Sequence, residues 1–189
     1  MENAANTPRR FGCGQCPGRA AALLAAALIF AVWACSAGQA LAKPAKQIAV
    51  LPFEIHDNSG EVGPNQHEEM LVRLTRFIGK QIESDGVFAV VDQGRVDEAV
   101  AAENSGTYLR ACNGCEFDIA RSVGADYVMI GWLFKMSTLV MSLHVVVKDV
   151  NTGGIVYAKT FDFRGDNEKS WTRAADYMVG ALSKSQATN

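Results

Sequence analysis

The first 42 residues decide which part of this chain is left to fold. Three arginines precede an uncharged apolar run from Ala20 to Cys35, and small residues follow it up to Ala42. A basic start, an apolar run of this length and an Ala-x-Ala ending are typical of a secretory signal peptide. The sequence therefore predicts export, cleavage after Ala42 and a mature chain that begins at Lys43.

Two other fates of this segment fit the pattern less well. The apolar run is shorter than the roughly 20 residues that span a bilayer, which argues against an uncleaved anchor. Cys35 ends a stretch that resembles a lipoprotein acylation motif, but bulky Trp33 stands where that motif prefers a small residue. Export to the periplasm or the medium is the favoured interpretation, and a lipoprotein acylated at Cys35 is the alternative.

The mature chain, residues 43–189, has the size and charge of one exported domain. It carries 15 Lys and Arg against 19 Asp and Glu, a net charge of −4. Such a length supports one hydrophobic core. An acidic, evenly mixed surface lacks the basic patch of nucleic-acid-binding proteins. We therefore expect a single α/β domain with its core at 47–183, and no nucleic-acid partner.

Apolar periodicity divides the mature chain into strands and helices. Strands are predicted at 47–55, 88–92, 126–136, 138–150 and 155–165, and helices at 67–86, 95–105, 115–124 and 167–185. The order β-α-β-α-α-β-β-β-α favours a mixed sheet of about five strands with helices packed on it. Alternation puts Leu139 and Ile155 on apolar strand faces, and we expect Tyr127, Trp132 and Phe134 in the core.

Several stretches resemble a known protein family. They are GADYVMIGWLFKM, KDVNTGGIV and FRGDNEKSWTRAADYM, together with Cys112 and Cys115, within a similarity that runs from Gln47 to Tyr177. The family consists of small exported bacterial proteins catalogued as a domain of unknown function. It is similar in fold to the N-terminal domain of TolB and to the periplasmic part of the curli-secretion lipoprotein. The resemblance implies a non-catalytic envelope module that contacts other proteins.

The stretch Cys112-Asn113-Gly114-Cys115 holds the only cysteines of the predicted mature chain. Haem attachment needs a histidine directly after the second cysteine, but Glu116 stands there. A zinc site needs two further ligands nearby, and the three histidines are scattered. In an oxidising compartment we expect a disulfide that fixes the start of a helix, worth about 2 kcal/mol. Thiol–disulfide exchange is the alternative, because a helix start lowers a thiol pKa.

A second candidate site follows the first predicted strand. His56, Asp57 and His67 flank a polar loop at its carboxyl end, where ligands of open α/β sheets bind. His67 lacks the partner histidine of an H-E-x-x-H zinc motif, so these residues are a possible ligand loop and not a predicted metal site.

No complete catalytic set and no phosphate-binding loop stands out in the sequence, and no cofactor is predicted. The favoured function is a non-catalytic accessory or binding module with an envelope protein as partner. A thiol–disulfide exchange protein and a small-ligand or metal carrier are the alternatives. The sequence does not reveal the oligomeric state.

Overall fold

The structure, a computed structural model, describes residues 46–61, 66–103 and 106–187. The predicted signal peptide, its cleavage after Ala42 and the alternative anchor Cys35 lie outside these residues. None of the helices in the described ranges is both long and apolar enough to cross a membrane. The described residues all belong to the predicted mature chain.

Strands and helices follow nearly the predicted order. In sequence they are β1 Gln47–Val50, β2 Glu54–Asp57, α2 Gln66–Ser84, β3 Ala89–Val90, α3 Gln93–Glu103, the 3-10 turn η1 Leu109–Ala111, α4 Cys115–Ser122, β4 Tyr127–Ser137, β5 Val140–Asp149, β6 Ile155–Phe163 and α5 Glu168–Ala187. The described strands form one six-stranded sheet in the order β3-β1-β4-β5-β6, with β2 also paired to β4. The β1–β3, β1–β4 and β2–β4 pairs are parallel, whereas β4, β5 and β6 are antiparallel. The predicted α/β class and mixed sheet are confirmed.

The sheet has one strand more than expected because the predicted strand 47–55 is divided at Pro52. Proline has no N–H to contribute to a strand ladder. The N–H of Phe53 donates to the Thr75 hydroxyl of α2, at 3.0 Å. The Phe53 ring then crosses β4 at Gly131, where an added Cβ would lie 2.1 Å from the ring. The chain thus turns toward α2 between two segments that both pair with β4.

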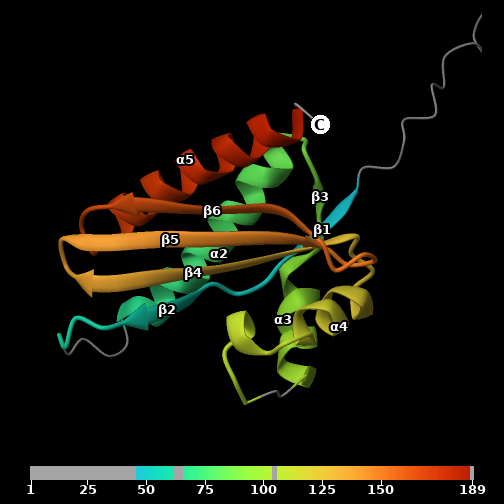
Figure 1. Ribbon diagram of the computed structural model, residues 1–189, viewed down its shortest axis with the longest axis horizontal. Coiled ribbons are helices and arrows are strands. Elements are labelled where there is room, and N and C mark those ends of the chain that lie inside the picture. The colour runs from blue at the N-terminus through green and yellow to red at the C-terminus, as the bar shows by residue number, and fades with distance from the viewer. Residues whose placement is uncertain (1–45, 62–65, 104–105, 188–189) are drawn as a thin grey trace, which may run out of the picture. The chain divides into compact units, whose positions relative to one another are not determined.

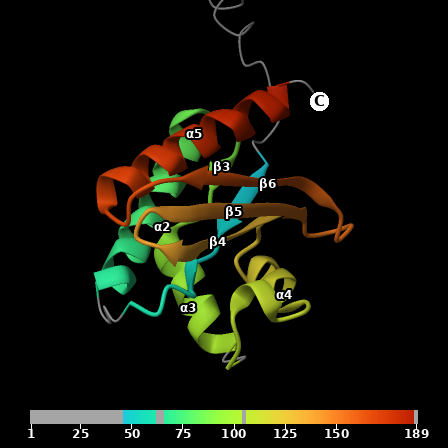
Figure 2. The same ribbon diagram turned by 60° about the vertical axis from the view of Figure 1, so that its left-hand side comes forward.

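Helices cover the two faces of the sheet unequally. Figures 1 and 2 show α2 and α5 along one face, and α3 and α4 on the other side. The larger core lies under α2 and α5 and includes Ile78, Met129, Leu143, Trp171 and Leu182. A smaller core lies under α3 and α4 and includes Leu51, Val96, Ile119, Val128 and Ile130. Within the described residues, helices therefore cover the second face only over β1 and the adjoining part of β4.

Four apolar side chains lie outside the positions that the sequence pattern predicts. Leu139 stands in the β4–β5 turn and is 68% exposed, and Ile155 at the start of β6 is 63% exposed. Trp132 and Phe134 are half-buried rather than in the core. They point away from α2 and α5, because alternate residues of β4 point to opposite faces and the helix-covered side takes Leu133. Tyr127 lies in the core as expected.

Helix boundaries follow their sequence signals. Gly86 and Gly124 follow α2 and α4 with φ of 68° and 77°, which a glycine adopts without strain. The Asn167 side chain accepts the backbone N–H of Ser170 at 3.0 Å and caps α5.

Candidate functional site

The structure separates His56 from Asp57 and His67, the other residues of the predicted ligand loop. Neighbouring strand residues point to opposite faces, so His56 and Asp57 leave β2 on opposite sides. The His56 ring stacks on Phe134, with 5.4 Å between ring centroids. Asp57 points to the side of α2 and α5, where His67 also lies. Both side chains belong to one cluster of charged residues around Lys135. The structure thus brings together two of the three residues.

Lys135 lies at the centre of that buried cluster. Its Nζ is 2.8 Å from an Asp166 oxygen, 3.3 Å from Asp57 and 3.4 Å from Glu61. The Lys135 side chain is only 4% exposed. Nε2 of His67 lies 2.9 Å from the same oxygen of Asp166. The cluster therefore joins β2 and its following loop to β4, α2 and the segment before α5.

The carboxylates keep Lys135 charged. Burial would lower the pKa of Lys135, but the hydrogen bond and charge of Asp166, with Asp57 and Glu61, raise it to about 12. Burial would also raise the pKa of Asp166, and its contacts with Lys135 and His67 lower it instead. A lysine that acts as base or nucleophile needs a depressed pKa. These charges are therefore suited to holding segments together.

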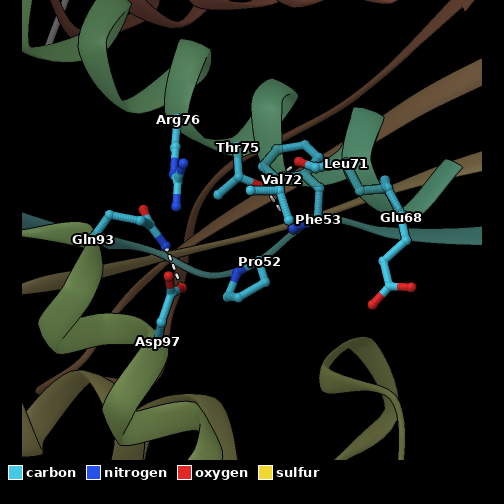
Figure 3. Close-up of a pocket in the computed structure, with 9 residues that line it drawn as sticks. All are labelled: Pro52, Phe53, Glu68, Leu71, Val72, Thr75, Arg76, Gln93 and Asp97. Carbon is cyan, nitrogen blue, oxygen red and sulfur yellow. Dashed lines mark hydrogen bonds between the residues drawn. The ribbon is translucent and has the colours of Figure 1, made fainter. Parts of the chain in front are cut away.

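A cavity of about 240 Å³ lies at the carboxyl end of β1 (Figure 3). It is lined by Pro52, Phe53, Glu68, Leu71, Val72, Thr75, Arg76, Gln93 and Asp97. From β1 the chain passes through β2 to α2 on one face of the sheet, whereas α3 follows the neighbouring strand β3 on the other. Ligands of open α/β sheets bind where the connections diverge in this way.

None of the three predicted loop residues lines this cavity. A ligand loop formed by His56, Asp57 and His67 therefore stays a prediction, and the cavity after β1 is lined by other residues. The apolar run 47–55 indicates a strand end at Ile55, whereas β1 ends at Val50. Only the break at Pro52 reveals where the cavity opens.

A second surface feature lies over β2, β4, β5 and β6, on the face that α3 and α4 leave uncovered (Figure 2). Strand register puts eight side chains there in two rows, Glu54, Trp132, His144 and Thr160 beside His56, Phe134, Ser142 and Asp162. All eight are at least partly exposed. These eight residues are called the open face.

Rings and hydroxyl groups on the open face are held in fixed contacts. Trp132 and His144 stack with centroids 4.9 Å apart and 2° between their planes. Nε2 of His144 lies 3.0 Å from the Ser142 hydroxyl, and Nδ1 lies 2.9 Å from the Thr160 hydroxyl. Burial lowers the pKa of His144, against the opposing effect of the Asp162 charge. The open face is thus an ordered surface of aromatic and hydroxyl groups.

Residues 108–110 border the open face. Arg110 donates from Nη1 to Glu54 at 2.9 Å, and its Nη2 lies 3.2 Å from Nδ1 of His56. The N–H of Leu109 donates to the second Glu54 oxygen at 2.5 Å. The guanidinium also lies over the ring of Tyr108, which is 57% exposed. This border adds tyrosine and arginine, two residue types enriched at the centres of protein interfaces.

The disulfide Cys112–Cys115 follows this border directly in the chain. Next to it, Glu116 is 4% exposed and accepts from the N–H of Gly114 and from Nζ of Lys148, both at 2.8 Å. Burial would raise the pKa of Glu116, but the contacts with Lys148 and with N–H groups at the helix start lower it. The disulfide and the ion pair together fasten the segment before α4 to β5.

Cys112, Cys115 and Glu116 bring possible metal-ligating atoms within 4.8 Å of one another. A metal is bound by thiolates, and the two sulfur atoms are joined to each other here. The arrangement is therefore not a metal site in the oxidised protein.

The fold is similar to several solved structures at low sequence identity. LpoB from Escherichia coli matches with a TM-score of 0.48 and 16% identity, over 86% of this chain and 82% of LpoB. PelC from Paraburkholderia phytofirmans, solved as a dodecamer, matches with a TM-score of 0.46 and 18% identity, over 79% and 92% of the two chains. TolB from Acinetobacter baumannii matches with a TM-score of 0.47 and 15% identity, over 76% of this chain but 28% of TolB.

No protein of curated function matches the sequence. Residues 46–181 match a family described as "Protein of unknown function (DUF2380)". This match covers nearly all of the described fold and agrees with the resemblance seen in the sequence. The chain belongs to that family.

Proposed function

We propose that this protein is a non-catalytic module of the bacterial envelope that binds another protein through the open face. Residues 1–42 act as a cleaved export signal, and residues 43–189 form one domain in the periplasm or outside the cell. The basic start, the apolar run and the Ala-x-Ala ending support export. The disulfide supports an oxidising compartment.

The observation that carries this proposal is the exposure of ordered aromatic side chains on an uncovered sheet face. Trp132 and Phe134 remain half-exposed although the strands around them belong to a well-packed sheet. Preordered rings lose little side-chain entropy when a partner covers them, so their burial favours association. Beside them, Tyr108 and Arg110 are held in place before any partner arrives.

The contacts of the open face favour a folded protein as the occupant. Trp132 and His144 already cover one ring face of each other, so a sugar ring has less free aromatic surface to stack on. Hydroxyl groups of Ser142 and Thr160 and the exposed carboxylate of Asp162 supply polar contacts beside the rings. Aromatic centres with polar rims are typical of protein–protein interfaces.

Thiol–disulfide exchange is less well supported by the surroundings of the cysteines. Cys115 starts α4, which favours a thiolate, but the buried Glu116 carboxylate lies 3.3 Å from the Cys112 sulfur. A negative charge at that distance disfavours a thiolate. A structural role for the disulfide, which holds the segment bearing Tyr108 and Arg110, fits these contacts better.

The proposal is tested by comparing the envelope proteins that cross-link to tagged variants in the host. Ala158→Arg on β6 adds an exposed charge next to the open face, and Ala101→Arg adds the same charge on the exposed side of α3. A partner recovered equally with the wild type and Ala101→Arg should fall at least about tenfold with Ala158→Arg. Equal recovery with both variants would exclude the open face as the binding surface.

A further inference from the structure

The cavity at the carboxyl end of β1 has an apolar wall that the fold holds in place. Phe53 is 4% exposed, and its N–H is bonded to Thr75 of α2. Pro52 precedes it, and Val72 of α2 is 46% exposed. In Figure 3 Pro52, Phe53 and Val72 lie around the same space. Such a wall suits an aliphatic group, because covering it removes apolar surface from water.

Opposite charges stand on the two helices that bound the cavity. The guanidinium of Arg76 in α2 forms no ion pair or hydrogen bond with any residue in the described ranges, and in Figure 3 it points toward α3. Asp97 of α3 accepts from Nε2 of Gln93 at 2.9 Å. The same Nε2 lies 3.3 Å from the carbonyl oxygen of Val50, which ties the start of α3 to the end of β1. A second carboxylate, that of Glu68, lies at the other end of the cavity (Figure 3).

These groups define the chemistry of an occupant. A free guanidinium suits a carboxylate, a carboxylate suits an ammonium group, and the apolar wall suits an aliphatic side chain. The volume of about 240 Å³ suits one residue-sized ligand rather than a large cofactor. We propose that the cavity between α2 and α3 binds a zwitterionic ligand with an aliphatic side chain, either a free amino acid or a short peptide.

The ligand class is tested by titrating the purified full-length protein with four probes while its backbone amide resonances are followed by NMR. Leucine and leucyl-leucine carry both charges, N-acetyl-leucine lacks the ammonium group, and leucinamide lacks the carboxylate. Leucine or leucyl-leucine should shift the resonances of 71–76 and 93–97 to saturation, with a Kd of about 1 mM or below. Either single-charge probe should bind at least about tenfold more weakly than leucine, because it lacks one of the two charged contacts.

The two sources of the ligand are separated by the same titration. Saturation by leucine identifies a free amino acid, whereas saturation by the dipeptide alone identifies a peptide. The proposal is overturned if neither compound gives saturable shifts up to about 10 mM, or if removing a charge leaves the affinity unchanged.

Three variants on exposed helix positions locate the site. Arg76→Gln and Asp97→Asn each remove one charge, and Val72→Trp fills the opening. Each should weaken binding at least about tenfold without changing the thermal unfolding midpoint by more than a few degrees. The control Arg173→Gln removes an exposed charge on α5 and should bind as the wild type does. Unchanged binding by Arg76→Gln or Val72→Trp would place the ligand elsewhere.

Discussion

The two halves of the sheet differ in how many of their faces are buried. Around β1 both faces carry helices, and Ile48, Ala49 and Val50 are all fully buried. Along β5 the described helices cover only one face, and buried residues such as Leu143 and Val145 alternate with half-exposed ones such as His144. Parallel strands between two helix layers become apolar throughout, whereas antiparallel strands keep one face for water or a partner. The open face, which we propose as the partner-binding surface, lies largely on the antiparallel half.

The largest expected effect comes from the charged cluster around Lys135 of β4, on the face of the sheet that α2 and α5 cover. Lys135→Met leaves Asp57, Glu61 and Asp166 close together without their cation. Breaking one side of a buried ion pair costs about 3–5 kcal/mol of unfolding free energy. Urea unfolding measures this loss, with Lys159→Met as the control because Lys159 is exposed on β6. Equal stability of the two variants would show that the cluster does not stabilise the fold.

The contrast between the two faces of the antiparallel strands β5 and β6 is tested next. Leu143→Ala should lower the unfolding free energy by about 2–5 kcal/mol, because Leu143 is 1% exposed beneath the helices. Thr160→Ala on the open face should lower it by only about 1 kcal/mol, because the exposed Thr160 side chain loses one hydrogen bond, to His144. Comparable losses in the two variants, measured by urea unfolding, would mean that the open face is part of the core.

Reduction of the disulfide should have a smaller and more local effect. Opening the short Cys112–Cys115 ring is expected to cost about 2 kcal/mol of unfolding free energy. Hydrogen exchange should become faster in η1 and α4, which the disulfide joins, and stay unchanged in α5. The double variant Cys112→Ser with Cys115→Ser should not respond to reductant. Loss of protection across α5 after reduction would contradict a local role.

The smallest expected effect is a loss of stability in acid. Burial would raise the pKa of Asp57, Glu116 and Asp166, yet hydrogen bonds and neighbouring cations lower all three in the folded protein. As the pH falls, the unfolded chain takes up protons first, near its ordinary pKa values of 3.8 for Asp and 4.5 for Glu. Their contribution is therefore complete above about pH 5 and is lost below it, as the pH falls through the folded pKa values.

Each carboxylate that takes up a proton on unfolding adds at most about 1.4 kcal/mol per pH unit to the slope of the unfolding free energy against pH. Asp166→Asn should make the decline below about pH 4 shallower, as measured by urea unfolding at several pH values. An identical slope in this variant and the wild type would show that Asp166 does not titrate with folding.

Much of the fold follows from local patterns in the sequence. The helices, the antiparallel strands and the turn at 151–154 are where periodicity and turn residues predict them. Pro52 is different, because one proline in an apolar run does not show whether the strand ends or resumes beyond it. The position of the cavity depended on that break.

The site residues were harder to predict because they depend on contacts that are distant in sequence. Lys135 and Asp166 meet only after β4 and the β6–α5 connection come together, and nothing local marks either one. Trp132 and Phe134 looked like core residues because aromatic residues in a strand favour burial. Which face of β4 the helices cover is decided by the whole topology.

In the proposed function, a protein partner in the envelope covers the open face. The most direct measurement is the yield of photo-cross-linking in living host cells, with a photoreactive phenylalanine analogue placed at Thr160 or at Ala101. The proposed function predicts one discrete cross-linked protein from position 160 and none of that size from position 101. The same product from both positions, or none from position 160, would contradict it.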